Sequence, residues 1–499
     1  MTGDPFWIGL DAGTSVVKAV LFDDALAVVR HAARRTGAHA PRPLWSEVDP
    51  EAVWEAAVDC LRAIGEGIDP ARIGGIGVTG CMVGACLVDA AHRPVRPAIL
   101  HNDGRAQALI EGLQARTPDL LEQVFATSGI ALQQGCTLPV LAWLDAHEPG
   151  SLDRAVAVLG MKDWLRLRLT GTIAGDPTEA AVAPGEARTR RRSAAMAELF
   201  GVAHRAALLP EIRPSESLAG GLDETAARAC GLRPGTPVAV GCGDVPASAL
   251  GAGVVRPGAA LTVLGTTCLN GIVVREPVRD GAPVGLHFAI PAGGFLRVMV
   301  NIAGTANIDW AIARFLAHLP EPERLAALMA EAEASPPGAL GLTWLPYLSG
   351  QGIVAPFLDP HARGALCGLE EVHGTAEILR AIHEGVAYAI RDCFDALGAL
   401  PDSLVLAGGG GRSPFWAQVI ADVLSRPVLV PEGGEQGARG AALLATVAAG
   451  RHAEPISAAI ALAPAIARRH DPRAEPAYLE GFARYRRIRD RLRGHGRDG

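Results

Sequence analysis

Two short stretches of the chain share nearly the same pattern, and this repeat constrains the fold more than any other feature. Residues 8–22 and residues 261–274 each contain an apolar run, a turn that carries Gly-Thr, and a second apolar run. A glycine turn between two strands presents backbone N–H groups and a hydroxyl, which are the groups that bind phosphate. One such turn in each half of the chain predicts duplicated domains that hold a nucleoside triphosphate between them.

Length and composition set the number and class of domains. A chain of 499 residues is too long for a single core, so we expect two domains, at residues 1–250 and 251–499. Stretches of strand and helix pattern alternate, which predicts α/β layers around a largely parallel sheet. The net charge of −7 argues against a nucleic-acid partner, whose binding surface would be basic.

The cysteines and the first residues indicate the cellular compartment of the protein. All nine cysteines are scattered singly, without Cys-x-x-Cys or His-Glu-x-x-His spacing, which predicts free thiols in a reducing compartment and no zinc site. Residues 1–7 have neither the basic nor the apolar region of a signal peptide. Apolar stretches such as 440–449 are too short to cross a bilayer. We therefore expect a cytoplasmic protein with no membrane partner.

Hydrophobic periodicity places the main elements. Helices are predicted over residues 51–64, 138–146, 162–169, 247–253, 375–397, 414–424 and 437–449, and strands over 72–79, 85–88, 237–240, 403–407 and 428–430. The basic stretch 485–493 also has helical periodicity, because apolar residues recur at helical spacing at Phe482, Tyr485, Ile488 and Leu492. It predicts a docked amphipathic helix with a solvated arginine face rather than a nucleic-acid contact.

The first Gly-Thr turn lies in the motif Asp-x-Gly-Thr-x-x-x-Lys. Gly13 lets the backbone approach a phosphate closely, and Thr14 can donate a hydrogen bond to it. Asp11, at the end of a strand, is placed to hold Mg²⁺, which prefers one or two carboxylates together with phosphates. Lys18 supplies a positive charge if it faces the phosphate. The alternative is a plain Gly-Thr hairpin.

Two further motifs follow strands. Asp244 ends one strand and starts a helix, so it is either the base that takes a proton from an attacking hydroxyl or an ordinary helix N-cap. Residues 408–413 read Gly-Gly-Gly-Gly-Arg-Ser, between a strand and a helix. So many glycines let an adenine or ribose lie on bare backbone, and the alternative is a flexible linker.

Polar residues near the N-terminal third are ambiguous by themselves. Asp103 and Arg105 can bind the hydroxyls of a polar substrate, or they can form a surface turn. Trp45 can cover the face of a sugar, or it can fill a gap in the core.

Taken together, these motifs resemble the FGGY family of carbohydrate kinases over nearly the whole chain. Residues 364–369 and 377–384 fit the C-terminal signature of that family. Residues 135–144 fit its other signature, except that Val140 replaces the usual lysine. The resemblance implies the fold of actin and hexokinase: two ribonuclease H-like, actin-like α/β domains with an interdomain cleft, whose closure would exclude water.

The resemblance also implies the site and its cofactors. Mg·ATP would lie mainly on the C-terminal domain and a sugar or polyol mainly on the N-terminal one, and the protein would be a homodimer, as many kinases of this type are. Asp244 falls on the catalytic aspartate, and it would bind Mg²⁺ together with Asp11. The implied ATP- and phosphate-binding residues are Gly13, Thr14, Ser15, Lys18, Gly265, Thr266, Thr267, Gly408, Gly409, Gly410, Arg412 and Ser413. The implied substrate-binding residues are Met82, Val83, Asp103, Arg105, Asp244 and Val245.

The substrate is where the resemblance loosens. Xylulokinases carry Gln-Met-His-Gly and Asp-Asn where this chain has Cys-Met-Val-Gly at 81–84 and Asp-Val at 244–245. A sugar hydroxyl buried against valine would go unpaired, which argues against D-xylulose. The Asp-Val pair, with 162–165 and 176–179, is similar to erythritol and L-xylulose kinases. We therefore expect phosphoryl transfer from ATP to a terminal hydroxyl of a ketopentose or small polyol. The alternatives are a partner-coupled ATPase of the same fold and a non-catalytic regulator that binds sugar and ATP.

Overall fold

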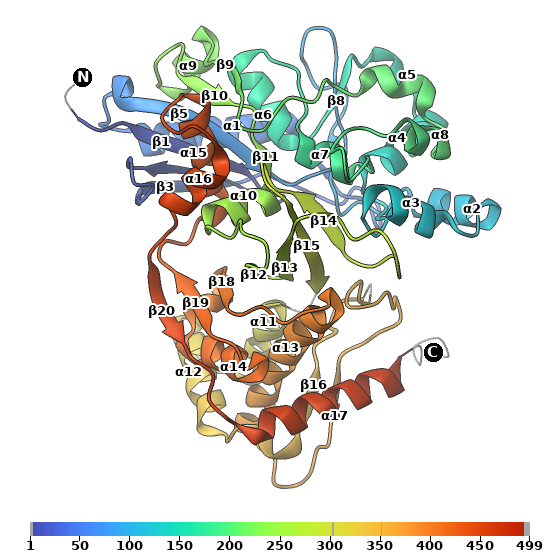
Figure 1. Ribbon diagram of the computed structural model, residues 1–499, viewed down its shortest axis with the longest axis vertical. Helices are drawn as coiled ribbons and strands as arrows, with labels where there is room; N and C mark the ends of the chain where they lie inside the picture. The colour runs from blue at the N-terminus through green and yellow to red at the C-terminus, as the bar shows by residue number, and fades with distance from the viewer. Residues whose placement is uncertain (1–2, 302–303, 351, 494–499) are drawn as a thin grey trace. The chain divides into compact units, whose positions relative to one another are not determined.

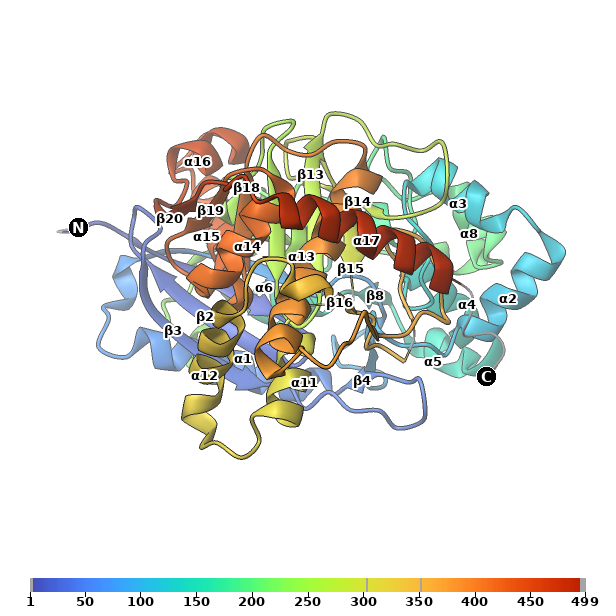
Figure 2. The same cartoon turned by 90° about the horizontal axis from the view of Figure 1, so that it is seen from below.

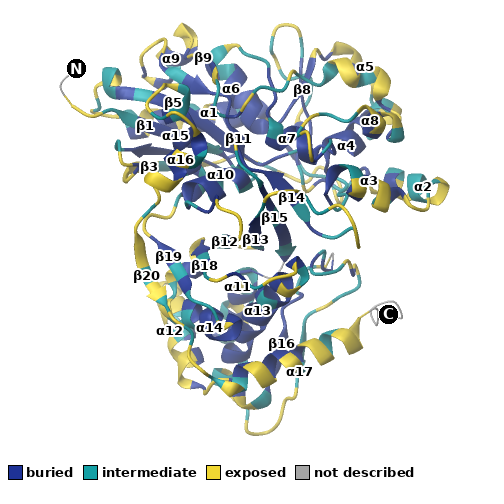
Figure 3. Ribbon diagram, viewed as in Figure 1, coloured by how far each residue is buried: buried dark blue, intermediate teal, exposed yellow. Residues whose placement is uncertain are grey.

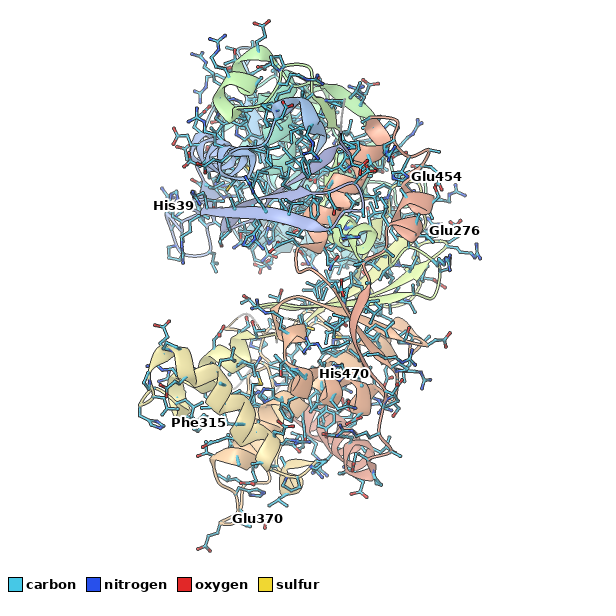
Figure 4. The ribbon with its side chains drawn as sticks, turned by 90° about the vertical axis from the view of Figure 1, so that its left-hand side faces the viewer. His39, Glu276, Phe315, Glu370, Glu454 and His470 are labelled. Atoms are coloured by element: carbon cyan, nitrogen blue, oxygen red, sulfur yellow. The ribbon has the colours of Figure 1, made fainter. Side chains whose placement is uncertain are left out.

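The computed structural model describes residues 3–301, 304–350 and 352–493, which form two compact units (Figure 1). The first unit comprises Met1–Val255, Val274–Leu296 and Glu435–Pro464, and the second comprises Arg256–Val273, Arg297–Gly434 and Ala465–Gly499. Each unit is thus assembled from separate stretches of chain. In Figure 4, Glu454 at the N-cap of α16 (Pro455–Ala461) lies among elements of the first unit, and His470 on β20 (Ile466–His470) lies among those of the second.

The sheet of the first unit confirms the predicted hairpin, but it is mixed rather than largely parallel, because antiparallel pairs lie at both of its ends. Its strands lie in the order β3-β2-β1-β5-β10-β9, with β11 also paired to β5. Strands β1 and β2 form the antiparallel hairpin around the Gly-Thr turn, and β5 runs parallel to β1, β10 and β11. The bounds are β1 Phe6–Ala12, β2 Val16–Phe22, β3 Val28–Arg35, β5 Ile73–Gly80, β9 Leu218–Gly221, β10 Pro237–Ala239 and β11 Cys242–Gly243.

The two faces of this sheet pack differently because side chains alternate along a strand. On one face Ile8, Leu10, Ile76 and Val78 join a buried apolar core with helices α1 (Pro50–Gly65) and α6 (Met161–Thr170). On the other face the strands carry glycines, against which α15 (Gln436–Ala448) packs (Figure 1). A side chain on the central strand would strike this helix: a Cβ at Gly77 would lie 1.7 Å from the carbonyl oxygen of Ala441.

The second seven-stranded sheet repeats the plan of the first. Its order is β14-β15-β13-β12-β18-β19-β20, with β12 and β13 as the antiparallel hairpin around the second Gly-Thr turn and β18 parallel to β12 and β19. The bounds are β12 Ala260–Leu264, β13 Cys268–Val274, β14 Leu286–Ala289, β15 Phe295–Asn301, β18 Leu404–Ala407 and β19 Val428–Pro431. The predicted helices α13 (Thr375–Leu397) and α14 (Pro414–Leu424) form over the residues expected.

The C-terminal helix α17 (Pro476–Leu492) docks as predicted, with two corrections. Tyr478, Phe482 and Tyr485 are buried, and the helix lies across α13 and α14 (Figures 2 and 3). The predicted contact of Leu492 is wrong, since this side chain is exposed at the last residue of the helix. The arginine face is also not wholly solvated, because Arg489 forms an ion pair with the buried Asp392.

The remaining elements complete the two units. They are β4 Glu47–Val48, β6 Cys86–Val88, β7 Ala98–Ile99, α2 Gln107–Arg116, α3 Leu120–Ser128, α4 Thr137–His147, α5 Pro149–Arg154, β8 Ala157–Leu159, α7 Pro177–Val182, α8 Ala194–Leu199, α9 Glu224–Cys230, α10 Asp244–Gly251, α11 Ala306–Phe315, α12 Glu321–Ala334, β16 Thr343–Leu345, β17 Ala365–Cys367, and the 3-10 turns η1 Pro70–Arg72, η2 Ala203–Leu208, η3 Ala339–Gly341 and η4 Gly409–Arg412. Across the described ranges no helix has both the length and the apolar composition needed to cross a membrane.

Candidate active site

Three loops of the first unit meet at one edge of its sheet. Strands β1, β5 and β11 run parallel, and Ala12, Gly80 and Gly243 lie in register at their carboxyl ends. From these ends the chain continues into the Gly-Thr turn, the turn at residues 81–84 and the start of α10. Because the carboxyl ends of neighbouring parallel strands share an edge, the side chains of these loops converge.

Asp11 lies at this edge on the face of the sheet covered by α15. Its Oδ2 lies beside Gly437 in the first turn of α15, where a Cβ would be 3.5 Å away. Its Oδ1 is buried and has no hydrogen-bond partner among the residues that the structure describes. Burial raises the pKa of Asp11 to about 6, although Lys18 lowers it and Glu435 adds to the rise. A buried carboxylate oxygen without a partner is a position for a cation or a hydrogen-bond donor.

Asp244 is the first residue of α10, directly after β11. The N-cap of this helix is Gly243, and the Asp244 carboxylate makes no capping bond; its Oδ1 accepts from the adjacent Val245 N–H at 2.8 Å. The interpretation of Asp244 as an ordinary N-cap is therefore wrong. Burial, and then the charge of Asp11, raise the pKa of Asp244 to about 7. A carboxylate that titrates near neutral pH is well matched to accepting a proton.

The two aspartates fit a divalent cation. Asp11 raises the pKa of Asp244, which means that the two carboxylates are close enough to repel each other. The unpartnered Oδ1 of Asp11 supplies a free oxygen ligand. Two carboxylates together with phosphate oxygens form the ligand set that Mg²⁺ prefers.

The Gly-Thr turn of this unit is short and fixed. A Cβ at Gly13 would lie 2.8 Å from the carbonyl oxygen of Val16. Thr36 pins the turn, because its Oγ1 donates to the Thr14 carbonyl at 2.8 Å and its N–H donates to the Ser15 carbonyl at 3.0 Å. The Ser15 side chain is exposed and that of Thr14 is half-buried.

Lys18 lies opposite Asp11 in the register of the hairpin. Its Nζ forms an ion pair with Glu435 at 3.0 Å, and both side chains are partly exposed. Glu435 directly precedes α15, so this pair joins the hairpin to the helix that covers Asp11. The predicted contact of Lys18 with a phosphate would have to compete with this partner.

The turn at residues 81–84 lies beside Asp244. Met82 packs onto Gly243, where a Cβ would come within 2.1 Å of its sulfur. Val83 has a positive φ of 57°, which is rare for a β-branched residue, and its N–H donates to Glu179 Oε1 at 2.6 Å. Sequence reasoning did not select Glu179, because an acidic residue in the first turn of a helix is ordinary at that position.

Glu179 and the two aspartates all act on one buried thiol. Burial, followed by the carboxylates of Asp244, Glu179 and Asp11, raises the pKa of the Cys81 thiol, so all three carboxylates lie within electrostatic range of this residue. In the sequence, Glu179 stands out only as part of the stretch 176–179. That stretch indicates similarity to a family and does not by itself indicate a site.

Asp103 and Arg105 do not form a surface turn, since both are buried. Arg105 pairs with Asp103 through Nε at 2.8 Å and with Glu47 through Nη2 at 2.6 Å. The second oxygen of Asp103 accepts from the Ser46 N–H at 2.6 Å, and the guanidinium lies 3.8 Å from the ring centroid of Trp45. Asp103 is thus already occupied by protein donors, whereas Arg105 Nη1 is buried without a partner among the described residues.

In the second unit, two glycine-containing loops follow neighbouring parallel strands. Strands β12 and β18 are paired, with Val263 opposite Ala407. The Gly265–Thr267 turn follows the first strand and the Gly408–Ser413 loop follows the second. The loops touch, because a Cβ at Gly408, which has φ +88°, would lie 2.6 Å from the carbonyl oxygen of Leu264. The two predicted nucleotide motifs therefore share one edge of this sheet.

The glycine loop is ordered, so its interpretation as a flexible linker is wrong. Residues 409–412 form the 3-10 turn η4, in which Gly410 is buried and Gly409 and Arg412 are exposed. Ser413 caps α14, since its Oγ accepts from the Trp416 N–H at 3.2 Å. In the other loop Thr266 and Thr267 are exposed, and the Thr305 N–H donates to the Gly265 carbonyl at 2.7 Å.

Two matched units, each with a Gly-Thr hairpin at the edge of its sheet, define a two-domain α/β fold of the sugar-kinase type. The chain matches the models of the FGGY family of carbohydrate kinases, the N-terminal domain over residues 6–251 and the C-terminal domain over residues 260–449. It belongs to that family and is a carbohydrate kinase.

Curated relatives span nearly the whole chain. The chain is 35% identical to a xylulose kinase of Escherichia coli over 89% of its length and 90% of the relative. It is also 35% identical to an erythritol kinase of Brucella abortus, over 97% of this chain and 95% of the relative. A crystal structure described as a xyloylose kinase from Brucella ovis superposes with a TM-score of 0.85 at 32% identity, covering 98% of this chain and 99% of that one.

Proposed function

We propose that the protein transfers the γ-phosphoryl group of Mg·ATP to a terminal hydroxyl of a small polyol or ketopentose, with Asp244 as the base. The observation that carries this proposal is the position and titration of Asp244. Its carboxylate stands at the start of α10 beside a second carboxylate, makes no capping bond, and has a pKa near 7. Asp244 accepts the proton of the attacking hydroxyl as that oxygen bonds to phosphorus.

The carboxylates of Asp11 and Asp244 would hold Mg²⁺, which supplies charge neutralisation for the phosphates. Support for this assignment comes from the unpartnered Oδ1 of Asp11 and from the mutual repulsion of the two groups. Phosphate contacts in the first unit are assigned to Gly13, Thr14 and Ser15, because Thr36 holds the carbonyls of this turn and a glycine turn binds phosphate through its backbone N–H groups. Lys18 joins them by exchanging Glu435 for a phosphate oxygen.

The nucleotide is assigned to the shared edge of the second unit. The Gly265–Thr267 turn offers two exposed hydroxyls for a phosphate. The exposed glycines of the Gly408–Ser413 loop leave room for the adenosine against bare backbone, with Gly410 buried beneath them and Arg412 exposed beside them. Ser413 contributes chiefly by capping the helix that follows.

The acceptor is assigned to the first unit, where Met82 packs onto Gly243 directly before Asp244, Val83 and Val245 are the neighbouring residues in sequence, and Arg105 offers one free donor. Two valines in place of polar side chains leave fewer partners for the hydroxyls of an acceptor, which favours a shorter acceptor with fewer polar groups to pair. A four-carbon polyol such as erythritol fits this lining, as does the similarity to an erythritol kinase over nearly the full length. D-xylulose is the second candidate, favoured by the similarity to a xylulose kinase. We also propose that the protein is a homodimer and that it is cytoplasmic.

The test is release of ADP by the purified protein with Mg·ATP and a panel of acceptors. The panel holds erythritol, glycerol, the pentitols, and both enantiomers of xylulose and ribulose. We expect erythritol to give the highest kcat/KM and Asp244→Asn to abolish most of that activity. A preference for D-xylulose would select the second candidate. ADP release that ignores the panel would instead indicate an ATPase, and ATP binding without turnover would indicate a regulator.

A further inference from the structure

Glu179 joins the turn at residues 81–84 to the interior of the first unit. It lies in the first turn of α7 with 8% of its surface exposed. Its Oε1 accepts the N–H of Val83, the residue with positive φ, at 2.6 Å. Its Oε2 is buried and has no hydrogen-bond partner within the described part of the chain. The turn is fixed a second time where the Gly84 N–H donates to the Gly135 carbonyl at 3.0 Å.

Behind Glu179 lies a buried cluster of two cations and two aspartates. Lys162 Nζ lies 2.7 Å from Asp163 Oδ1 and 2.5 Å from Asp176 Oδ2. Arg166 Nη1 lies 2.6 Å from the same oxygen of Asp163 and also donates to the Val240 carbonyl. In this cluster each aspartate already has a cation. The carboxyl of Glu179 is an additional acid without an ion-pair partner of its own among the described residues.

The groups around Glu179 disfavour its ionised form. Burial raises its pKa to about 8, Asp163 and Asp176 add to the rise, and Lys162 and the Val83 N–H oppose it. Arg192 also lies within electrostatic range, but it directs Nε and Nη2 to the Pro210 carbonyl. The other titratable neighbours are the thiols of Cys81 and Cys136, which burial keeps protonated, and the carboxylates of Asp244 and Asp11 act on the same Cys81 thiol.

The neighbouring residue couples the same turn of α7 to the base. Thr178 Oγ1 accepts the N–H of Gly243, immediately before Asp244, at 2.9 Å. Through Thr178 and Glu179, one helical turn therefore holds the backbone on both sides of the acceptor position. This turn is itself anchored by Asp176 in the buried cluster.

We propose that Glu179 is a positioning residue for acceptor binding, which holds Val83 and Met82 in place through the Val83 N–H. This inference rests on the proposed function, which assigns the acceptor to that turn. A neutral carboxyl accepts the N–H through its carbonyl oxygen without adding charge to the interior. The Val83 N–H would bind a carboxylate more strongly, but ionisation also puts a charge without its own counter-ion beside two aspartates in the interior. This larger cost favours exposure of the carboxylate to water, which loosens the turn and weakens acceptor binding.

The experiment compares Glu179→Gln, Glu179→Leu and the control Glu198→Gln, which alters an exposed acid on α8 of the same unit. The readouts are the KM for erythritol, the KM for D-xylulose and the KM for ATP, between pH 6 and 9.5. In the wild type and the control, acceptor KM should rise above pH 8. Glu179→Gln keeps the acceptor oxygen and cannot ionise, so its acceptor KM at pH 7 should stay within about threefold of wild type and its alkaline rise should vanish. Glu179→Leu leaves the Val83 N–H unpaired, so acceptor KM should rise about tenfold with ATP KM unchanged.

An unchanged alkaline rise in Glu179→Gln, or an unchanged acceptor KM in Glu179→Leu, would overturn the inference. Hydrogen exchange of the peptide that contains residues 81–84 separates this failure from failure of the proposed function, since it needs no substrate. Faster exchange in Glu179→Leu with unchanged acceptor KM would mean that Glu179 holds the turn but the acceptor binds elsewhere. Unchanged exchange would mean that Glu179 does not hold the turn.

Discussion

Replacing Asp244 by asparagine should make the protein more stable while nearly abolishing its activity. In the wild type, burial and the charge of Asp11 raise the pKa of Asp244 from 3.8 to about 7. A raised carboxyl pKa means that the folded state binds a proton that the unfolded state has released. The stability that depends on this proton is fully present below pH 3.8 and is lost as pH rises through 7.

The size of this effect follows from the two pKa values. A rise from 3.8 to about 7 corresponds to at most about 4 kcal/mol of stability lost by pH 8. Asparagine keeps an oxygen that can accept from the Val245 N–H, which lies 2.8 Å from the carboxylate. It removes the buried charge and its repulsion with Asp11. Turnover should fall by about 10²–10⁴ because the base is lost.

The assay is urea unfolding followed by tryptophan fluorescence, with EDTA present so that no cation bridges the carboxylates. Asp244→Asn should be more stable than wild type at pH 8 and should lose this advantage towards pH 4. Asp59→Asn, which changes an exposed acid on α1, is the matched control and should leave both stability and turnover unchanged. Equal stability of Asp244→Asn and wild type at pH 8, or near-normal turnover of the variant, would refute the reasoning.

Three further experiments, with four substitutions in all, test the fold and the site. Gly77→Ala puts a Cβ 1.7 Å from the Ala441 carbonyl oxygen, so thermal unfolding should shift down by a loss of about 3 kcal/mol or more, and a wild-type melting curve would contradict the packing. Gly408→Ala, at φ +88° and 2.6 Å from a neighbouring carbonyl oxygen, should raise KM for ATP more than KM for the acceptor in steady-state kinetics. The pair Val83→His and Val245→Asn should raise kcat/KM for D-xylulose relative to erythritol by about tenfold or more, and an unchanged ratio would show that these positions do not select the acceptor.

The architecture was predictable because its signals are local. The Gly-Thr hairpins require glycine within a few residues of two apolar runs, so both appear as motifs, and α13 and α14 form over the residues that their periodicity indicates. The family follows from the same motifs. Leu492 was misplaced because periodicity fixes the face of a helix but not the residue at which its packing ends.

The site was predictable only in part, because pairing partners distant in sequence decide what a polar residue does. Asp103 and Arg105 look like a surface turn until Glu47 and Ser46, more than fifty residues earlier, are placed beside them. Lys18 looks free to meet a phosphate until Glu435, 417 residues later, is placed at 3.0 Å. No local pattern records either contact.

The same reasoning explains why sequence points to the proposed base and not to Glu179. The proposed role of Asp244 needs a carboxylate at the end of a strand, and the strand itself is a local pattern. Glu179 contacts the backbone of Val83, 96 positions earlier, and no property of either side chain requires the other. The one feature that sequence shows here is Val83, a β-branched residue before a glycine, which has a strained positive φ in the structure. In such a turn the buried N–H of Val83 must find an acceptor. If the acceptor binds at this turn, as proposed, its selection depends on how firmly the turn is held, so the residues that hold it are where acceptor preference should be altered.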